Sequence, residues 1–205
     1  MSFKKNNYQV IKGCISKELA DFVYNYFLLK RKVVRKFFDM RYISPFATEW
    51  GVWNDEQVPE TYSHYSDIVM ETLLEKLAEP MSKETELELI PTYSYARIYK
   101  KGDVLKRHKD RYSCEVSMTM NLGGDAWPIY LEPSGETDKE GVKIDLEPGD
   151  ALIYRGCEVE HWREAFEGEN CAQVFLHYND ASGENAKENA YDRRPFLGLP
   201  NWFKS

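Results

Sequence analysis

The stretch RIYKKGDVLKRHKD, residues 97–110, decides the fold of this chain of 205 residues. It carries His108 and, two positions later, Asp110. Because residues i and i+2 of an extended strand point to the same side, these two side chains can bind one ion together. A second histidine, His161, stands in a later strand-like segment and can supply a third ligand. Two histidines and one carboxylate form the face of a non-haem iron site, which leaves other coordination positions open for oxygen chemistry.

The sequence from residue 87 onward reads as short strands separated by turns. Turn signals such as Gly123-Gly124 and Pro148-Gly149 divide apolar or alternating runs. The strands that this pattern predicts cover residues 87–100, 114–122, 127–132, 142–146, 151–155, 159–165 and 170–178. Short strands at regular spacing are typical of a double-sheet sandwich. We therefore expect a mainly β fold of the jelly-roll or cupin-like kind, preceded by helices.

The N-terminal part of the chain has helical periodicity. After an opening strand at residues 8–12, Ser16 is a candidate N-cap for a helix that runs to about Leu29. A second helix begins near Ile68 and is expected to end at Pro80, because proline disrupts a helix interior. The expected organisation is a single domain, 1–205, with a helical support (1–86), a β-sandwich core (87–178) and a C-terminal tail that packs back on the core (179–205).

The composition is that of a globular protein, with 42% hydrophobic and 14% aromatic residues. The formal net charge of −7 disfavours nucleic-acid binding, which normally requires a broad basic surface. Four cysteines without a Cys-x-x-Cys pair indicate a reduced, intracellular protein. The start has no apolar signal core and no segment reaches membrane-spanning length, so we expect a cytoplasmic protein without a membrane partner. The oligomeric state is not indicated by the sequence.

A His-x-Asp triplet is a weak motif by itself, because many such triplets lie on protein surfaces. The alternative to a metal site is an exposed His108 and a buried His161 that is hydrogen-bonded within the core. Strand context, a second histidine at a suitable place and the expected sandwich together favour the metal site. The other two of the four histidines, His64 and His177, are expected to be structural.

Residues 93–178 resemble the catalytic core of the 2-oxoglutarate- and Fe(II)-dependent oxygenases, and most of all their prolyl-hydroxylase branch. The pattern Tyr-x-x-Gly, His-x-Asp, Pro-Gly-Asp-Ala-Leu and His is matched by Tyr99, Gly102, His108, Asp110, Pro148 to Leu152 and His161. The resemblance implies a double-stranded β-helix that holds Fe(II) through His108, Asp110 and His161. It also implies 2-oxoglutarate and O₂ as cosubstrates, and succinate and CO₂ as coproducts. The carboxylate of Asp110 favours hydroxylation, since a site without it would have room for a halide.

The chain departs from this family at one position. The prolyl-hydroxylase branch has a Lys or Arg about nine or ten residues after the distal histidine, and that cation pairs with the far carboxylate of 2-oxoglutarate. Asn170 and Cys171 stand there in this chain, and a buried dianion without a cation is costly. We expect Arg163 to replace the cation, because it lies two residues after His161 on the same face of a strand. Arg97 is the second candidate.

Tyr99 and Asn121 are candidate contacts of the cosubstrate. Tyr99 falls where the family often has a tyrosine that hydrogen-bonds 2-oxoglutarate, although an aromatic packing role fits it equally. Asn121 lies on the small polar face of an alternating strand, which in this fold is well placed to line the pocket. A surface strand would show the same alternation. For Arg163, the alternative is an exposed side chain paired with Glu160 or Glu164.

The expected function is hydroxylation of a substrate that the sequence does not identify. A peptidyl prolyl side chain is the first hypothesis, by resemblance alone. Other peptide, protein or small-molecule substrates stay open, and the acidic charge balance disfavours nucleic acid. The alternative from another class is a cupin-like binding or scaffold domain without turnover. Production of succinate in the presence of iron and 2-oxoglutarate distinguishes the two.

Overall fold

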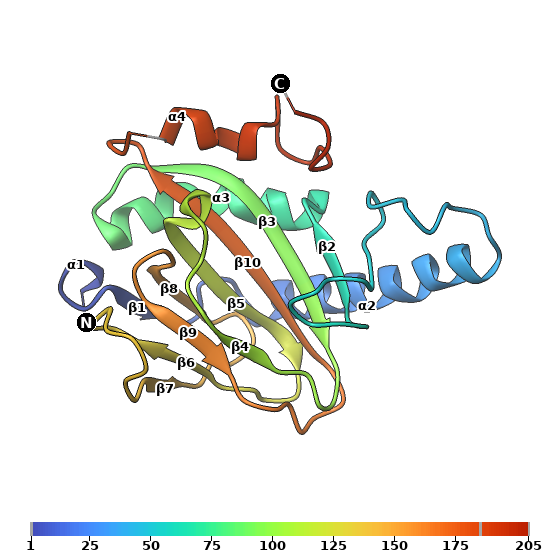
Figure 1. Ribbon diagram of the computed structural model, residues 1–205, viewed down its shortest axis with the longest axis horizontal. Helices are drawn as coiled ribbons and strands as arrows, with labels where there is room; N and C mark the ends of the chain where they lie inside the picture. The colour runs from blue at the N-terminus through green and yellow to red at the C-terminus, as the bar shows by residue number, and fades with distance from the viewer. Residues whose placement is uncertain (1, 185, 205) are drawn as a thin grey trace.

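The computed structural model describes residues 2–184 and 186–204, which form two antiparallel β-sheets packed as a sandwich (Figure 1). The larger sheet has six strands in the order β1-β8-β5-β10-β3-β2, and the smaller has four in the order β4-β9-β6-β7. The strands are β1 (Tyr8–Ile11), β2 (Tyr62–Tyr65), β3 (Leu89–Tyr99), β4 (Leu105–His108), β5 (Val116–Gly124), β6 (Ile129–Glu132), β7 (Val142–Ile144), β8 (Ala151–Arg155), β9 (Glu160–Arg163) and β10 (Cys171–Asp180). The mainly β sandwich is therefore as predicted.

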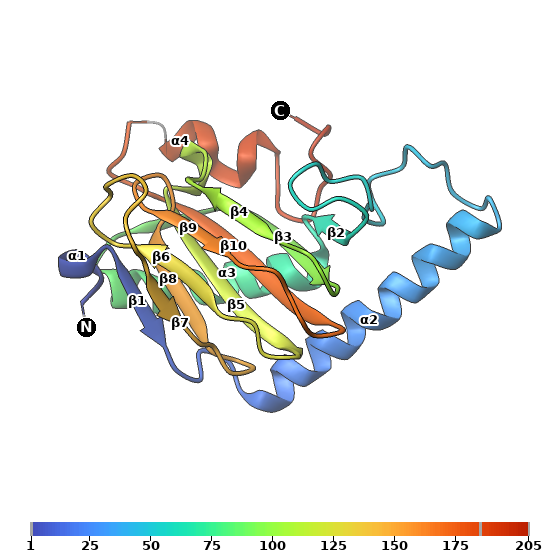
Figure 2. The same cartoon turned by 60° about the horizontal axis from the view of Figure 1, so that its bottom comes forward.

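Two long helices cover the outer face of the larger sheet (Figure 2). The helical elements are α1 (Phe3–Asn6), α2 (Lys17–Asp39), α3 (Ile68–Thr85) and α4 (Ala186–Asn189), with 3₁₀ turns η1 (Tyr112–Cys114) and η2 (Ala190–Arg193). Ser16 is the N-cap of α2, as predicted, because its side chain accepts a hydrogen bond of 3.2 Å from the backbone N–H of Leu19. Within the described part of the chain, no helix is both long and apolar enough to cross a membrane.

The central strand β5 shows how the sequence separates the core from the interior of the sandwich. Its apolar residues Val116, Met118, Met120 and Leu122 are fully buried and belong to the same core cluster as the inner faces of α2 and α3. Its intervening polar residues, which include Ser117 and Thr119, bond to other buried polar groups. Burying each large apolar side chain contributes roughly 1.5–3 kcal/mol relative to exposure. The strand period of two therefore places a polar surface inside the sandwich.

The helix boundaries and two strands differ from the sequence-based expectation. α2 continues ten residues beyond Leu29, because the residues that follow still bury Val34 against the core. α3 contains Pro80 and extends to Thr85, so the predicted end was wrong. The buried Met81 and Thr85 keep the last turn packed despite the missing N–H of the proline. Strands β2 and β4 were not among the predicted strands.

The C-terminal tail lies along α3 and β3 at the upper side of Figure 1. Its Arg194 is fully buried and pairs with the buried carboxylate of Glu71 on α3 at 2.8 Å. Another guanidinium contact of 3.1 Å goes to the backbone carbonyl of Thr92 on β3. Since removing one partner of a buried ion pair typically costs about 3–5 kcal/mol, this pair anchors the tail on the sandwich.

Candidate metal centre

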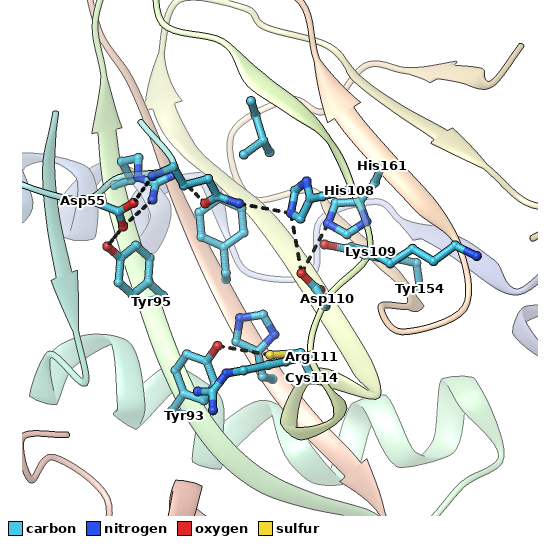
Figure 3. Close-up of a pocket in the computed structure, with 15 residues that line it drawn as sticks. Asp55, Tyr93, Tyr95, His108, Lys109, Asp110, Arg111, Cys114, Tyr154 and His161 are labelled. Carbon is cyan, nitrogen blue, oxygen red and sulfur yellow. Dashed lines mark hydrogen bonds and ion pairs between the residues drawn. The ribbon is translucent and has the colours of Figure 1, made fainter. Parts of the chain in front are cut away.

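Three side chains, two from paired strands and one from the segment that follows β4, converge inside the sandwich (Figure 3). β4 and β9 are antiparallel neighbours with His108 opposite His161, and the centroids of the two imidazole rings are 4.2 Å apart. Asp110 follows β4, and its Oδ1 lies 3.7 Å from Nε2 of His108 and 3.5 Å from Nε2 of His161. Ligands that bind one ion at about 2.0–2.2 Å must lie roughly this close to one another. The side chains predicted from the sequence therefore meet at one point.

Both histidines present the same ring nitrogen to this point. Nδ1 of His108 lies 2.7 Å from the backbone carbonyl of Lys106, and Nδ1 of His161 lies 3.3 Å from that of Val159. A carbonyl only accepts, so each Nδ1 donates its proton to the carbonyl, and Nε2 is the ring nitrogen of each histidine that is directed at Asp110. Burial lowers the pKa of His108, which keeps its imidazole neutral and able to bind a metal.

The third member of the cluster, Asp110, is oriented by a hydrogen-bonded chain from the larger sheet. Ser117 on β5 donates its hydroxyl proton to Oδ2 of Asp110 at 2.7 Å, and Nδ1 of His177 on β10 donates to the Ser117 oxygen at 2.9 Å. Burial lowers the pKa of His177 to about 4, so its imidazole is neutral. Burial would raise the pKa of Asp110, but His161 and Ser117 outweigh it and hold that pKa below its usual range. Oδ1 of an ionised Asp110 is thus left for the metal.

A second cluster of ligand-type side chains shares Asp110. The ligand atoms of Asp110, Cys114 and His177 also lie within 4.8 Å of one another. Cys114 is hydrogen-bonded to the hydroxyl of Tyr93 at 3.1 Å, and burial raises the pKa of its thiol to about 12. A protonated thiol is a poor metal ligand. Since His177 is also engaged with Ser117, the cluster of His108, Asp110 and His161 is the better metal site.

The centre opens into a pocket of about 360 Å³. One wall is formed by Asp55, Gln57 and Arg97, and another by Tyr93 and Arg111. Gln57 lies with its amide nitrogen 3.2 Å from Nε2 of His108 and accepts a hydrogen bond of 3.2 Å from Arg97. Arg97 also pairs with Asp55 at 2.7 Å. Asp55 and Gln57 were missed by sequence reasoning, because they lie in a loop without periodicity or motif.

Arg163 is fully buried and has no carboxylate partner among the residues that the structure describes. On β9 it is the register partner of Leu105, which lines the pocket, but Arg163 itself is not among the residues that line it. One of its amino groups donates to the backbone carbonyl of Trp127, and its Nε and second amino group have no hydrogen-bond partner. Burial lowers the pKa of this guanidinium, which means that its charge is poorly stabilised without an anion. The predicted alternative, an exposed arginine paired with a neighbouring glutamate, is excluded by this burial.

Tyr99 and Asn121 are buried, but neither lines the pocket. Tyr99 packs its ring 4.6 Å from that of Trp127 and accepts a hydrogen bond of 3.2 Å from Arg97. The amide of Asn121 donates to the backbone carbonyl of Leu146 at 2.8 Å, and its oxygen accepts from a backbone N–H two residues on. A cosubstrate contact for Asn121 stays a prediction, and it would require the amide to exchange these backbone partners.

The Ser117 hydroxyl is expected to control metal affinity through the orientation of Asp110. Ser117→Ala should weaken Fe(II) binding by about 10- to 100-fold, the usual effect of losing a hydrogen bond that orients a metal ligand. The dissociation constant can be measured by anaerobic titration. Thr119→Ser, on the same polar face of β5, is the matched control and should bind Fe(II) like the wild type. Equal affinities for Ser117→Ala and the wild type would show that the hydroxyl does not orient the ligand.

Comparison with known proteins identifies the fold. No family model matches the sequence, and no curated protein matches it either. Among solved structures, a prolyl-4-hydroxylase from Pseudomonas putida is 15% identical, with a TM-score of 0.59 over 88% of this chain and 96% of that one. AviO1 from Streptomyces viridochromogenes Tue57 is 14% identical, with a TM-score of 0.64 over 90% of this chain and 94% of that one.

A third similar structure is HygX from Streptomyces hygroscopicus, solved with nickel and 2-oxoglutarate bound. It is 13% identical and has a TM-score of 0.59 over 88% of this chain and 85% of that one. At these identities the likeness establishes the fold. It confirms the predicted double-stranded β-helix, the fold of the 2-oxoglutarate- and Fe(II)-dependent oxygenases that the resemblance named.

Proposed function

We propose that this chain is an Fe(II)- and 2-oxoglutarate-dependent dioxygenase that hydroxylates its substrate and releases succinate and CO₂. The observation that carries the proposal is the convergence of Nε2 of His108, Nε2 of His161 and Oδ1 of Asp110 on one point. This donor set fits Fe(II), and bound iron would supply the activation of O₂ together with 2-oxoglutarate. The fold shared with HygX, whose structure contains nickel and 2-oxoglutarate, supports the same pair of cofactors here.

In such a site some protein groups bind the ion and others orient its ligands. His108, Asp110 and His161 are the residues that would hold the ion, and a site with only three protein ligands would leave positions for a chelating cosubstrate and O₂. The backbone carbonyls that hold both Nδ1 protons keep the imidazoles turned toward the ion. The burial of His161 limits access of water from that side of the centre, while His108 and Asp110 face the pocket.

Arg163 is proposed to bind the distal carboxylate of 2-oxoglutarate. Its guanidinium is buried with two nitrogen atoms unpaired, and a carboxylate is the group whose two oxygens match such a fork. Cys171, at a position where the prolyl-hydroxylase branch carries a cation, is close enough for Arg163 to influence its thiol. Arg163 on β9 would therefore replace the cation that the prolyl-hydroxylase branch carries and that this chain lacks at the start of β10. Arg97 is the less suitable candidate, because Asp55 already neutralises it.

Asn170 and Cys171 are expected not to provide the main anchor for that carboxylate, since neither carries the positive charge that a buried carboxylate requires. Asn170→Ala and Cys171→Ala should each change the KM for 2-oxoglutarate by less than about tenfold, a bound of roughly 1.4 kcal/mol. Steady-state kinetics with 2-oxoglutarate as the varied substrate measures this. A rise of about a hundredfold in either variant, roughly 2.7 kcal/mol, would place the anchor at that position.

The substrate is proposed to be a peptidyl prolyl side chain, in keeping with the prolyl-4-hydroxylase among the similar structures. A polar small molecule is the second candidate, because the pocket wall of Asp55, Gln57 and Arg97 offers charged and amide groups rather than an apolar surface. HygX, which has the same fold, has been solved with hygromycin B bound. A substrate that carries several hydroxyl or amino groups could form hydrogen bonds with these three side chains.

The test of the proposed function is succinate formation by the purified protein with Fe(II), 2-oxoglutarate and O₂. A screen of prolyl peptides and polar small molecules should accompany this measurement. A mass gain of 16 Da, one oxygen atom, identifies the substrate. A protein that binds Fe(II) and 2-oxoglutarate but forms no succinate with any compound would favour the non-catalytic cupin-like alternative.

A further inference from the structure

Helix α2 carries a row of exposed apolar side chains on the face that turns away from the sandwich. Its inner face buries Ala20, Val23, Phe27 and Val34 in the core. Its outer face exposes large apolar residues, with 67% of Phe22 and 62% of Leu29 open to solvent, and Met40, the C-cap residue directly after the helix, is 67% exposed. In Figure 2 the helix runs past the edge of the β-sheets, so its C-terminal turns project from the body of the domain. The outer stripe is defined as Leu19, Phe22, Leu29, Val33 and Met40.

The spacing of the outer stripe is that of a helix–helix seam. With the half-buried Tyr26 and the exposed Lys36, its positions follow one another at alternating intervals of three and four residues. At 3.6 residues per turn, such positions stay on one face, and they form the a and d positions of a coiled coil. Isolated exposed apolar residues are ordinary, whereas several on one helix face mark an interaction surface. Two positions interrupt the row, because Tyr26 packs against the core and donates a hydrogen bond to Asp67, and Lys36 is charged.

The charges beside the outer stripe change sign along the helix. Glu18 and Asp21 lie near its N-terminus and Lys32 lies near its C-terminus, all of them exposed. At 100° per residue these three fall on one flank of the stripe, and Lys36, a position of the stripe itself, lies at the edge on that side. Among the ion pairs of the described residues, none involves Glu18, Asp21, Lys32 or Lys36, whereas Asp39 on the same flank is paired with Arg35 at 3.1 Å.

We propose that the outer stripe of α2 is the interface of a homodimer, in which the α2 helices of two copies pair antiparallel about a two-fold axis. Antiparallel pairing centred between Tyr26 and Leu29 places Phe22 against Val33 of the second copy. The same register brings Glu18 next to Lys36 of the second copy, on both sides of the axis. Parallel pairing would instead place Glu18 beside Glu18 and Lys36 beside Lys36, which is repulsive.

The loop that follows α2 extends this surface. Tyr42 and Phe46 are 78% and 89% exposed, and they continue the apolar row beyond Met40. In the antiparallel arrangement they reach past the N-terminal end of the second copy's helix. Stable homodimers usually bury about 800 Å² or more on each partner, so contacts from this loop would add to those of a single helix face.

A membrane surface is the other partner that an amphipathic helix with exposed aromatic residues could take. Lys30, Arg31 and Lys32 would suit anionic lipids. Glu18 and Asp21 at the other end of the same helix, and the net charge of −7 for the chain, oppose that attraction. The opposite charges at the two ends of α2 favour a second copy of this chain, because antiparallel pairing brings the acidic end of each helix to the basic end of the other.

The oligomeric state of the full chain tests the proposal. Analytical ultracentrifugation should find a dimer in the wild type, and Leu29→Glu should weaken dimerisation by at least about tenfold, because the axis brings two carboxylates together. Ile68→Glu, which alters an apolar residue of α3 that is 71% exposed, is the matched control and should leave the dimer intact. Circular dichroism and thermal melting establish that each variant is folded.

Charge exchange tests the antiparallel direction. Glu18→Lys and Lys36→Glu should each weaken the dimer, and the double variant should restore it, since both pairs are reversed together. A monomeric wild type at about 100 μM would overturn the proposal, as would a dimer that Leu29→Glu leaves unchanged. A wild type that stays monomeric but binds vesicles of anionic phospholipid would show that the stripe serves a membrane instead.

Discussion

Replacement of His108 or His161 by alanine is expected to abolish both iron retention and turnover. Each substitution removes one of three protein ligands and leaves two donors that hold the ion weakly. The other ligands stay in place, because Asp110 is held by Ser117 and the remaining histidine by its own strand carbonyl. Bound iron can be counted by elemental analysis after anaerobic reconstitution and desalting.

Lys109→Ala is the matched control for these variants. Lys109 stands between two metal ligands in the sequence, but its ammonium group reaches out to the backbone carbonyl of Gly135 at 3.2 Å. This variant should retain one equivalent of iron and measurable turnover. Retention of a full equivalent of iron by His161→Ala would mean that the ion is bound elsewhere, and the cluster of Asp110, Cys114 and His177 would then be examined by substitution.

Arg163→Ala is expected to raise the KM for 2-oxoglutarate at least tenfold while leaving Fe(II) binding nearly intact. The cosubstrate chelates the ion at one end, so its distal carboxylate must lie several ångströms away and needs a buried cation. Removing one partner of such a buried charged pair costs about 3–5 kcal/mol, because the other charge is stranded. Arg163→Lys should recover part of the loss, since it restores the charge but not the two parallel hydrogen bonds.

Arg97→Lys is the comparison that distinguishes the two candidate cations. It preserves a charge beside Asp55, and its KM should stay close to that of the wild type if Arg163 is the anchor. Normal 2-oxoglutarate affinity in Arg163→Ala, together with a raised KM in Arg97→Lys, would assign the carboxylate to Arg97. Fe(II) titration of each variant separates loss of cosubstrate binding from loss of the metal.

The convergence of His108, Asp110 and His161 was predictable from the sequence because their geometry is local or fixed by strand pairing. His108 and Asp110 are two residues apart on an extended backbone, so one face holds both. Arg163 was placed beside His161 by the same rule, and its burial follows from the inward direction of that face. The alternation of β5 likewise separates core residues from polar ones such as Ser117. Each of these inferences requires only that successive side chains of a strand alternate between its two faces.

Features that depend on distant contacts were not predictable. Gln57 reaches His108 from a loop whose path is set by packing against β3, and no periodicity marks that loop. The role of His177 in orienting Asp110 through Ser117 requires two strands that are neighbours in space only. The helix around Pro80 persists because buried neighbours outweigh the local cost of proline. In each case tertiary contacts, which a single sequence does not encode locally, decide the outcome.

The most direct test of the central claim is a crystal structure of the protein grown without oxygen in the presence of Fe(II) and 2-oxoglutarate. We predict one ion bound by Nε2 of His108, Nε2 of His161 and Oδ1 of Asp110, at about 2.0–2.2 Å. The distal carboxylate of 2-oxoglutarate should lie against the guanidinium of Arg163. An ion held by Cys114 and His177, or one beyond bonding distance of His108 and His161, would contradict the assignment of this centre.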